Sequence, residues 1–154
     1  MVNVNLTAPL FEAEMRRWAL KNVPLIGKAA HSAVTTAVYQ GIVQKTPVLT
    51  GRARNNWFPT NGVPSPEAVE ETAGVSRTGE PMTAQETARI NIVTRKLKGL
   101  PLGSQEVFIT NNLDYIQGLE DGKSLKSPPN GMVQNTIINT LDALQIDIVS
   151  VTGL

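Results

Sequence analysis

The chain has 154 residues, of which 41% are hydrophobic and 18% are charged, and it contains no cysteine. This composition predicts a globular domain rather than a disordered or fibrous protein, and it excludes disulfides, thiolate catalysis and cysteine metal sites. The net charge of +1 predicts no global attraction to nucleic acid or to an anionic membrane, so such a contact would need a local patch. The sequence shows neither the residue order of a signal peptide nor an apolar run of bilayer length, and we therefore expect an intracellular protein with no membrane partner.

Two helices are predicted in the N-terminal third. Apolar residues recur at helical spacing from Pro9 to Leu20, and more regularly from Leu25 to Gln44. Between them, Asn22-Val23-Pro24 predicts that one helix stops and another begins, because asparagine caps helices and proline is tolerated in a first turn. Pro47 and Gly51 should end the second helix.

A polar insert separates the N-terminal helices from the next regular elements. Asn55 to Phe58 is a candidate strand, and the insert follows at about 59–82. It is rich in proline, glycine and acidic residues with little apolar periodicity, so we expect it to be mobile. Thr83 to Lys98 should form a third helix, with Thr83 and Glu86 as a capping box. Its buried side should carry Ala88, Ile92 and Leu97.

The C-terminal part predicts a strand, a loop and a helix. Glu106 to Thr110 is the clearest strand, being short and β-rich between turn residues. Met132 to about Ile146 should form the closing helix, and Asp147 to Val151 a last strand. The buried face of that helix should carry Val133, Ile137, Leu141 and Leu144. The order of elements predicts a single α+β domain over residues 1–154, in which long N-terminal helices and a C-terminal helix pack on a small, mostly antiparallel sheet.

No group of residues indicates catalysis. His31, the only histidine, lies within a helix without a nearby nucleophile, which favours a surface or partly packed side chain over a general base. Glu120-Asp121 is interpreted as a solvated turn, because the Asn and Asp residues before it do not match a calcium loop. Gly118 and Gly122 lack the context of a phosphate loop. We therefore predict no enzyme activity, catalytic residue, metal or cofactor.

Basic residues form two groups. Arg52 and Arg54 lie in TGRARNNW, where an extended segment would place both on one face, directed at Glu120 of the same or an adjacent subunit. A second group on the third helix could face DNA, although a solvated helix face is favoured at this net charge. That group is Arg89, Arg95, Lys96 and Lys98. Trp57 is predicted to anchor the core or an interface, because only Phe58 accompanies it as a possible base-stacking partner.

The loop YIQGLEDGKSLKSPPNGM, from Tyr115 to Met132, combines backbone-restricting prolines with permissive glycines. Its shape is therefore specified, yet it carries no catalytic cluster. A binding surface is a better use for such a loop than catalysis, since prolines lower the cost of ordering it before docking.

Two motifs resemble those of the minor tail protein Z family, the neck or tail-completion proteins of long-tailed bacteriophages. TPVLTGRARNNW (Thr46 to Trp57) is similar to the family element P-x-x-TGR-x-R-x-x-W after a long helix. VFITNNLDYIQGLEDGKSLKSPPNGMV (Val107 to Val133) resembles a strand ending in Asn-Asn, then Tyr, Leu-Glu-x-Gly-x-Ser and Pro-x-Gly-Met before the last helix. The chain departs from the family with Asp114, where proline is frequent, and with Lys126-Ser127, where Gln-Ala is frequent.

The resemblance implies a structural virion protein of the head–tail neck region, present in the host cytoplasm during assembly. It implies a ring of identical subunits, most simply a hexamer, that completes or joins the tail. Its partners would be other copies of the chain, neighbouring tail-terminator, tail-tube or head-closure proteins, and, without sequence specificity, genomic DNA in the channel. The residues expected at the assembly interface are Arg52, Arg54, Trp57, Asn111, Asn112, Tyr115, Glu120, Gly122, Ser124, Pro128, Gly131 and Met132.

Three other functions stay open at this point. A tail-terminator ring subunit would share the small α+β character. A nucleic-acid-binding accessory protein would rely on the basic third helix. A small hydrolase is the least favoured, because no constellation of residues supports it.

Overall fold

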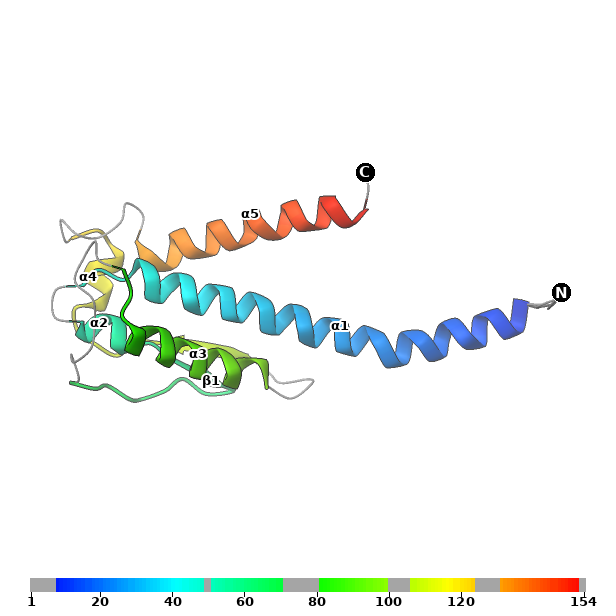
Figure 1. The fold of residues 1–154 in the computed structure, drawn as a ribbon, viewed down its shortest axis with the longest axis horizontal. Helices are drawn as coiled ribbons and strands as arrows, with labels where there is room; N and C mark the ends of the chain where they lie inside the picture. The colour runs from blue at the N-terminus through cyan, green and yellow to red at the C-terminus, as the bar shows by residue number, and fades with distance from the viewer. Residues whose placement is uncertain (1–7, 49–50, 71–80, 100–105, 124–130, 153–154) are drawn as a thin grey trace.

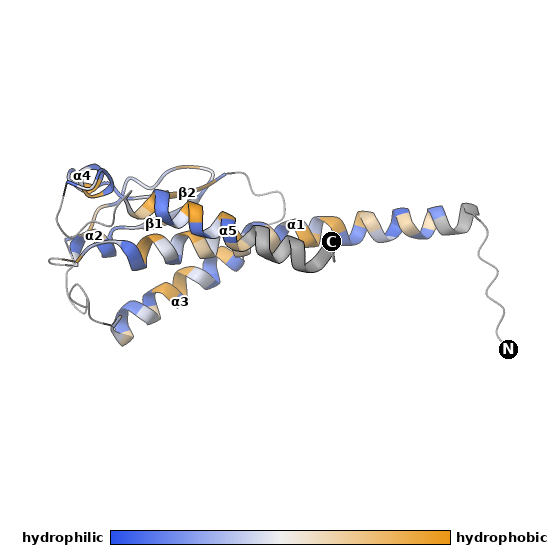
Figure 2. Ribbon diagram, turned by 90° about the horizontal axis from the view of Figure 1, so that it is seen from above, coloured by the Kyte–Doolittle hydropathy of each residue, from blue (hydrophilic) through white to orange (hydrophobic). Residues whose placement is uncertain are grey.

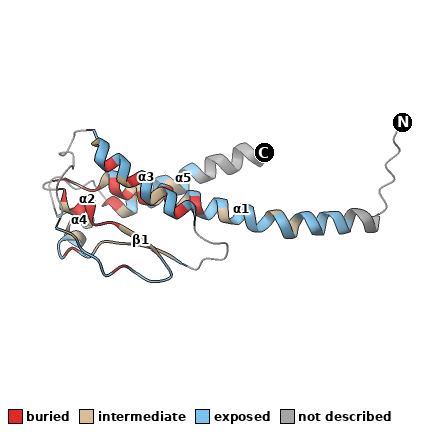
Figure 3. Cartoon of the chain, turned by 60° about the horizontal axis from the view of Figure 1, so that its bottom comes forward, coloured by how far each residue is buried: buried red, intermediate tan, exposed pale blue. Residues whose placement is uncertain are grey.

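One long helix, α1 (Ala8–Lys45), determines the shape of the molecule (Figure 1). The computed structural model describes residues 8–48, 51–70, 81–99, 106–123 and 131–152, and for residues 8–11 and 144–152 it describes the backbone only. The C-terminal part of α1 packs into the body of the molecule, and its N-terminal part projects from that body. Figure 3 shows the projecting part as almost entirely exposed.

The helix continues through the position at which we predicted a break. Pro24 lies inside α1, and because it has no N–H the carbonyl of Leu20 loses its helical hydrogen bond. Figure 1 shows α1 changing direction in this N-terminal part. The expected stop at Asn22-Val23-Pro24 is therefore wrong, since residues with good helix propensity on both sides keep the helix going and proline only bends it. The Asn22 amide donates to the carbonyl of Trp18 at 2.8 Å instead of capping a new helix.

Six shorter elements complete the chain. They are α2 (Arg52–Asn55), β1 (Phe58–Asn61), α3 (Ala84–Lys98), β2 (Val107–Thr110), α4 (Ile116–Glu120) and α5 (Met132–Thr152). The strands pair antiparallel, with Phe58 opposite Thr110 and Asn61 opposite Val107. The expected α+β fold is thus confirmed, as are the third helix, its capping box and the strand near residues 106–110.

Two strand predictions are wrong. The strand expected at Asn55 to Phe58 begins only at Phe58, as β1, and Asn55 is the last residue of α2. Arg52 and Arg54 lie in α2, so they do not alternate along an extended segment. Residues 147–151 continue α5. That stretch is rich in β-branched residues, but no glycine or proline separates it from the helix before it, and the helix extends through it.

The core lies where α1, α3 and α5 meet. α1 packs against α3 on one side and against α5 on the other. The buried apolar residues of this cluster are Tyr39, Ile42, Val43, Trp57, Ile90, Leu97 and Met132. On α3, Leu97 is buried as predicted and Ile90 faces the core with it. Ala88 and Ile92 are exposed, so these two residues of the predicted buried side are wrong.

On α5 the predicted buried face is correct only at Val133, which is partly buried against the core. Thr136 is buried, whereas Ile137 and Leu141 are exposed, and the side chain of Leu144 lies outside the described residues. The reason is a close helix crossing: a Cβ built on Gly41 of α1 would lie 2.5 Å from the Cγ2 methyl of Thr136. Only small side chains allow that approach, so the small polar side of α5 turns toward α1 and its large apolar side turns outward.

Candidate assembly interface

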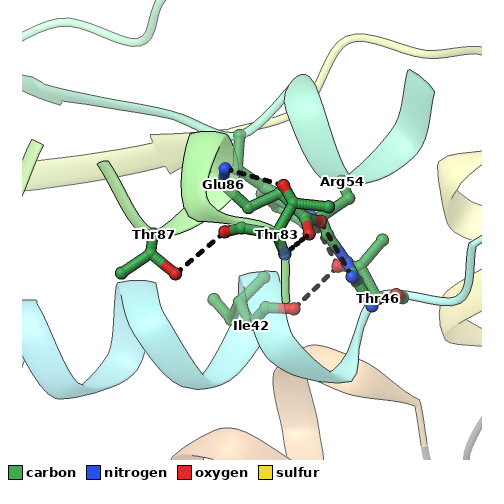
Figure 4. A network of polar contacts seen from close by, with 7 residues as sticks. Ile42, Thr46, Arg54, Thr83, Glu86 and Thr87 are labelled. Carbon is green, nitrogen blue, oxygen red and sulfur yellow. Dashed lines mark hydrogen bonds and ion pairs between the residues drawn. The ribbon is translucent and has the colours of Figure 1, made fainter. Parts of the chain in front are cut away.

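The first motif connects the end of α1 to the start of α3 through a buried ion pair (Figure 4). Arg54 donates to a carboxylate oxygen of Glu86 at 2.9 Å, and only 9% and 4% of these two side chains are exposed. The guanidinium also donates to the backbone carbonyl of Thr46 at 3.2 Å. Glu86 completes the capping box by accepting the backbone N–H of Thr83 at 2.8 Å. Arg54 is therefore held inside this chain and cannot reach a neighbouring subunit.

Trp57 is part of the same structural unit. Its indole Nε1 donates to the Thr46 hydroxyl at 2.9 Å, and that hydroxyl donates to the carbonyl of Ile42 at 2.7 Å. Trp57 is 7% exposed and belongs to the core cluster. Of the two roles predicted for this residue, the core role is confirmed.

Arg52 lies at the surface and pairs with Glu70, whose side chain is 82% exposed. Burial raises the pKa of the Tyr115 phenol, the Arg52 guanidinium opposes that rise, and the Glu70 carboxylate adds to it. The expected pairing of Arg52 and Arg54 with Glu120 does not form within the chain. Arg52, Glu70 and Tyr115 instead form an exposed polar group beside α2 and α4.

Three asparagines hold loop backbone against the body. The amide of Asn111 donates to the carbonyl of Ala53 in α2 at 2.9 Å, so the second motif is tied directly to the first. Asn112 donates to the carbonyl of Ser65 at 2.8 Å. Asn56 is fully buried and makes hydrogen bonds with both the N–H and the carbonyl of Val69. The first part of the insert, up to residue 70, is thus anchored, and residues 71–80 lie outside the described residues, so mobility of the insert stays a prediction.

Glu120 caps α5 rather than forming a solvated turn. Its carboxylate accepts the backbone N–H groups of Met132 at 2.8 Å and Val133 at 2.9 Å, where a helix has unpaired donors and favours negative charge. Gly131 has a φ of +73°, and a Cβ at this position would lie 2.4 Å from the Glu120 carboxyl carbon. Only glycine fits. Asp121, by contrast, is exposed as predicted, and hydrogen bonds from Gln117 and then Lys123 lower its pKa.

The residues predicted at the assembly interface therefore divide into two groups. Half of them build the body of the chain: Arg54, Trp57, Asn111, Glu120, Gly131 and Met132. Those with exposed or partly exposed side chains are Arg52, Asn112 and Tyr115, and Gly122 has open space around it. Ser124 and Pro128 lie outside the described residues. The motifs thus specify a rigid frame more than a contact surface.

The basic residues of α3 do not form one surface. Arg89 is half-buried and donates to the carbonyl of Asn55 at 2.6 Å, so it is a structural residue. Arg95, Lys96 and Lys98 are exposed in the last turn of α3, where positive charge is favourable for the helix dipole. Three cations remain available to an anionic partner, one fewer than predicted.

Two exposed apolar helix faces were missed by the sequence reading. The projecting part of α1 exposes Met15, Trp18, Leu20, Val23, Leu25 and Ile26, with exposed fractions between 48% and 75%. Figure 2 shows hydrophobic and hydrophilic residues together along this part of the helix. On α5 the exposed apolar residues are Ile137, Ile138 and Leu141. The helical spacing of both was visible in the sequence, and on α5 it was assigned to a buried face.

Two cavities lie among the described residues, and neither brings together a nucleophile and a general base. One of about 290 Å³ lies between β1 and α3 and is bordered by Trp57, Arg89 and Lys96. Another of about 410 Å³ lies between α1 and α5 and is lined mainly by small and amide side chains. His31 is exposed on α1, as expected. Within the described ranges, no three His, Asp or Glu residues are grouped to hold a metal ion.

The described helices were also compared with the requirements of a membrane span, and none is both long and apolar enough to be one. Comparison of the whole chain with protein-family models, with curated proteins and with solved structures finds no match.

Proposed function

We propose that this chain is a structural subunit of the neck of a long-tailed bacteriophage, a tail-completion protein that acts at the head–tail junction. In this role it forms a ring of identical copies, most simply a hexamer. The ring contacts tail-terminator, tail-tube or head-closure proteins. The chain acts by shape and contact and performs no chemistry.

The observation that carries the proposal is the presence of both family-like motifs, TGRARNNW and NNLDYIQGLEDGKS followed by PPNGM, in the same order and spacing. Their geometry supports treating them as one structural unit, since the side-chain amide of Asn111 in the second motif donates a hydrogen bond to the carbonyl of Ala53 in the first at 2.9 Å. The buried Arg54–Glu86 pair and the Glu120 cap hold that unit rigidly. A closed ring needs such rigidity, because each contact must repeat at the same angle.

The exposed apolar faces of α1 and α5 give further support. Chains that function as monomers rarely leave contiguous apolar helix faces in water. In a subunit of an assembly, neighbouring subunits can cover such faces. This argument favours an assembly protein over a small hydrolase, whose exposed surface would need no such partners.

A phage that encodes this chain, with a stop codon in place of Trp18, tests the proposal. We expect filled heads and tails to accumulate unjoined, or tails to remain incomplete, and a plasmid copy of the wild-type chain to restore joined particles. Electron microscopy of the lysate and antibody detection in purified virions provide the measurements. Normal virions that lack the chain would overturn the proposal.

The same electron microscopy images distinguish a tail-completion subunit from a tail terminator. A terminator caps a growing tube, so its loss should leave tails of irregular length. Loss of a tail-completion subunit should leave tails of normal length without heads.

Contact with genomic DNA is a second role that one observation favours. Arg95, Lys96 and Lys98 lie together and exposed at the end of α3. A patch of three cations would bind DNA weakly, without sequence preference and with strong salt dependence. Replacing all three with glutamine should abolish any shift of DNA by the purified chain at low salt, and binding that persists in the triple variant would reject this patch.

A further inference from the structure

The projecting part of α1 has one apolar side and one basic side. Its apolar side, here called the projecting face, consists of Met15, Trp18, Val23, Leu25 and Ile26, which are each about half exposed. Arg17, Lys21 and Lys28 are separated by four and seven residues, and this spacing places them on the opposite side of the helix. Between residues 12 and 30 there are four basic and two acidic residues, so this segment is positively charged.

α5 has the opposite charge and its own unpartnered apolar side. That side, here called the outer face, consists of Ile137, Ile138 and Leu141, which are 43%, 44% and 53% exposed. The sequence of α5 contains two aspartates and no lysine or arginine. Asp142 lies directly beside the outer face and is exposed.

The two faces cannot cover each other within one chain. Thr136 is buried against Gly41 of α1, and the outer face lies on the other side of α5 from this contact. The projecting part of α1 moreover extends beyond the body (Figure 1). None of the described residues covers either face, which leaves both open to another molecule.

A second copy of this chain fits both faces at once. The projecting segment of α1 and the 21-residue α5 are each about 30 Å long at 1.5 Å per residue. Their net charges are opposite, so the rims of a contact between them attract. An unrelated partner on one face would leave the other apolar face uncovered, whereas pairing the two covers both.

We propose that the projecting face of α1 in one copy docks on the outer face of α5 in the next copy. The contact joins two different surfaces, so each copy offers one face and accepts another, and repetition closes into a ring if the angle permits. This contact deepens the proposed function, on which it rests for the ring in the virion. Its test uses purified chain and no phage.

Sedimentation of the purified chain over a range of concentrations is the first measurement. We expect concentration-dependent association beyond the dimer. Trp18→Asp and Leu141→Asp should each weaken it by about 10- to 100-fold, because each removes a large apolar contact and places a charge in it. Both side chains are exposed in the single chain, so the helical circular dichroism and the unfolding midpoint of each variant at low concentration should match the wild type.

Two control variants introduce the same residue, aspartate, at neighbouring positions. Leu20 is 75% exposed but lies away from the projecting face, so Leu20→Asp should change association by less than about twofold. Asn139 is exposed toward the cavity between α1 and α5, so Asn139→Asp tests that cavity as the docking site instead. Loss of association in Asn139→Asp with none in Leu141→Asp would overturn the inference.

Mixing the two weakened variants identifies the type of contact. The Trp18→Asp chain has an unaltered outer face, and the Leu141→Asp chain has an unaltered projecting face. A 1:1 mixture should therefore form a heterodimer and nothing larger. A symmetric α1–α1 contact would instead leave the Leu141→Asp chain dimeric on its own, with no heterodimer gained on mixing. That result, or a wild-type chain that stays monomeric at about 1 mM or stops at a dimer, would overturn the proposal.

The outcomes also separate this contact from the phage role. Association that follows the expected variant pattern, together with normal virions lacking the chain, would keep the contact and reject the neck function. Unjoined heads and tails in the stop-codon phage, together with undiminished association of Leu141→Asp, would keep the neck function and reject the contact.

Discussion

The carboxylate of Glu120, the last residue of α4, accepts the backbone N–H of Met132, the first residue of α5, at 2.8 Å. It also accepts the next two N–H groups, so one side chain satisfies three donors that a helix start leaves unpaired. This contact holds the end of α4 against the start of α5, twelve residues later in the sequence. The negative charge of the Glu120 carboxylate also lies at the start of α5, where the helix dipole favours it.

Removing this cap should destabilise the chain. We expect Glu120→Ala to lower the free energy of unfolding by about 1–3 kcal/mol, and Glu120→Gln by less, because glutamine keeps one acceptor oxygen. Urea unfolding at low protein concentration provides the measurement. Glu67→Ala, which removes an exposed carboxylate, is the control and should stay within about 0.5 kcal/mol of wild type. Equal effects of the alanine variants at positions 120 and 67 would show that the cap contributes nothing.

Gly131 and Gly122 form a matched pair for a second prediction. Both have positive φ, at +73° and +72°, but a Cβ on Gly131 would overlap Glu120 whereas one on Gly122 would meet open space. Gly122→Ala should therefore cost only the backbone strain of about 1–2 kcal/mol. Gly131→Ala should cost that strain and the overlap as well, so its urea midpoint should be clearly lower. A midpoint for Gly131→Ala equal to that of Gly122→Ala would contradict the close approach.

The buried pair Arg54–Glu86 supports a third prediction. Arg54→Met leaves the Glu86 carboxylate alone in a site where its side chain is 4% exposed, and this should cost about 3–5 kcal/mol. Glu86→Gln keeps the cap on α3 but leaves the guanidinium uncompensated. The double variant should cost less than the sum of the two, because it leaves no lone buried charge.

Arg52→Met is the control for that cycle. Arg52 pairs with Glu70, which is 82% exposed, and exposed ion pairs contribute about 0–1 kcal/mol. Strictly additive losses at positions 54 and 86, measured by chemical unfolding, would show that the two side chains are not coupled.

Local signals in the sequence were sufficient for the elements whose determinants are local. The Thr83–Glu86 capping box fixes the start of α3, and the β-rich run before Asn111 gives β2. Pro24 was misleading, because a proline signal alone does not distinguish a helix end from a bend. Thr136 shows a different limit: its burial depends on Gly41, nearly a hundred residues earlier, and apolar periodicity on α5 pointed to the opposite side.

The candidate site was predictable as a set of motif residues but not in its roles. The arginines of TGRARNNW were expected to act together, yet the Arg54 side chain is buried and that of Arg52 is partly exposed, because α2 turns them in different directions. Their acceptors, Glu86 and Glu70, come from segments whose placement no local pattern specifies. Glu120 was likewise expected to bind an arginine, and its partner is the start of a helix twelve residues later.

The two tryptophans should respond in opposite ways to the same substitution. Trp57 is 7% exposed and Trp18 is 53% exposed. Trp57→Ala should lower the free energy of unfolding by about 3–5 kcal/mol, through lost packing and a cavity. Trp18→Ala should change it by less than about 0.5 kcal/mol while the chain is monomeric, since alanine keeps the helix and more than half of the Trp18 surface is exposed among the described residues. Urea unfolding of both variants at one low concentration tests the pair, and a large loss for Trp18→Ala would place that side chain in the core of the monomer.

Tyr39 should make the chain sensitive to alkali. It is 2% exposed, and burial raises the pKa of its phenol, with the Arg89 guanidinium opposing part of that rise. In the unfolded chain the phenol loses its proton near pH 10, whereas the folded chain still holds it. Above that pH the unfolded state binds fewer protons, so the free energy of unfolding falls as the pH rises.

The Tyr39→Phe variant has no proton to lose at this position, so its free energy of unfolding should fall less steeply between pH 9 and pH 11 in urea titrations. Tyr115→Phe, at a position that is 43% exposed, should remove a smaller part of the slope. An unchanged slope in Tyr39→Phe would show that this phenol does not link folding to pH.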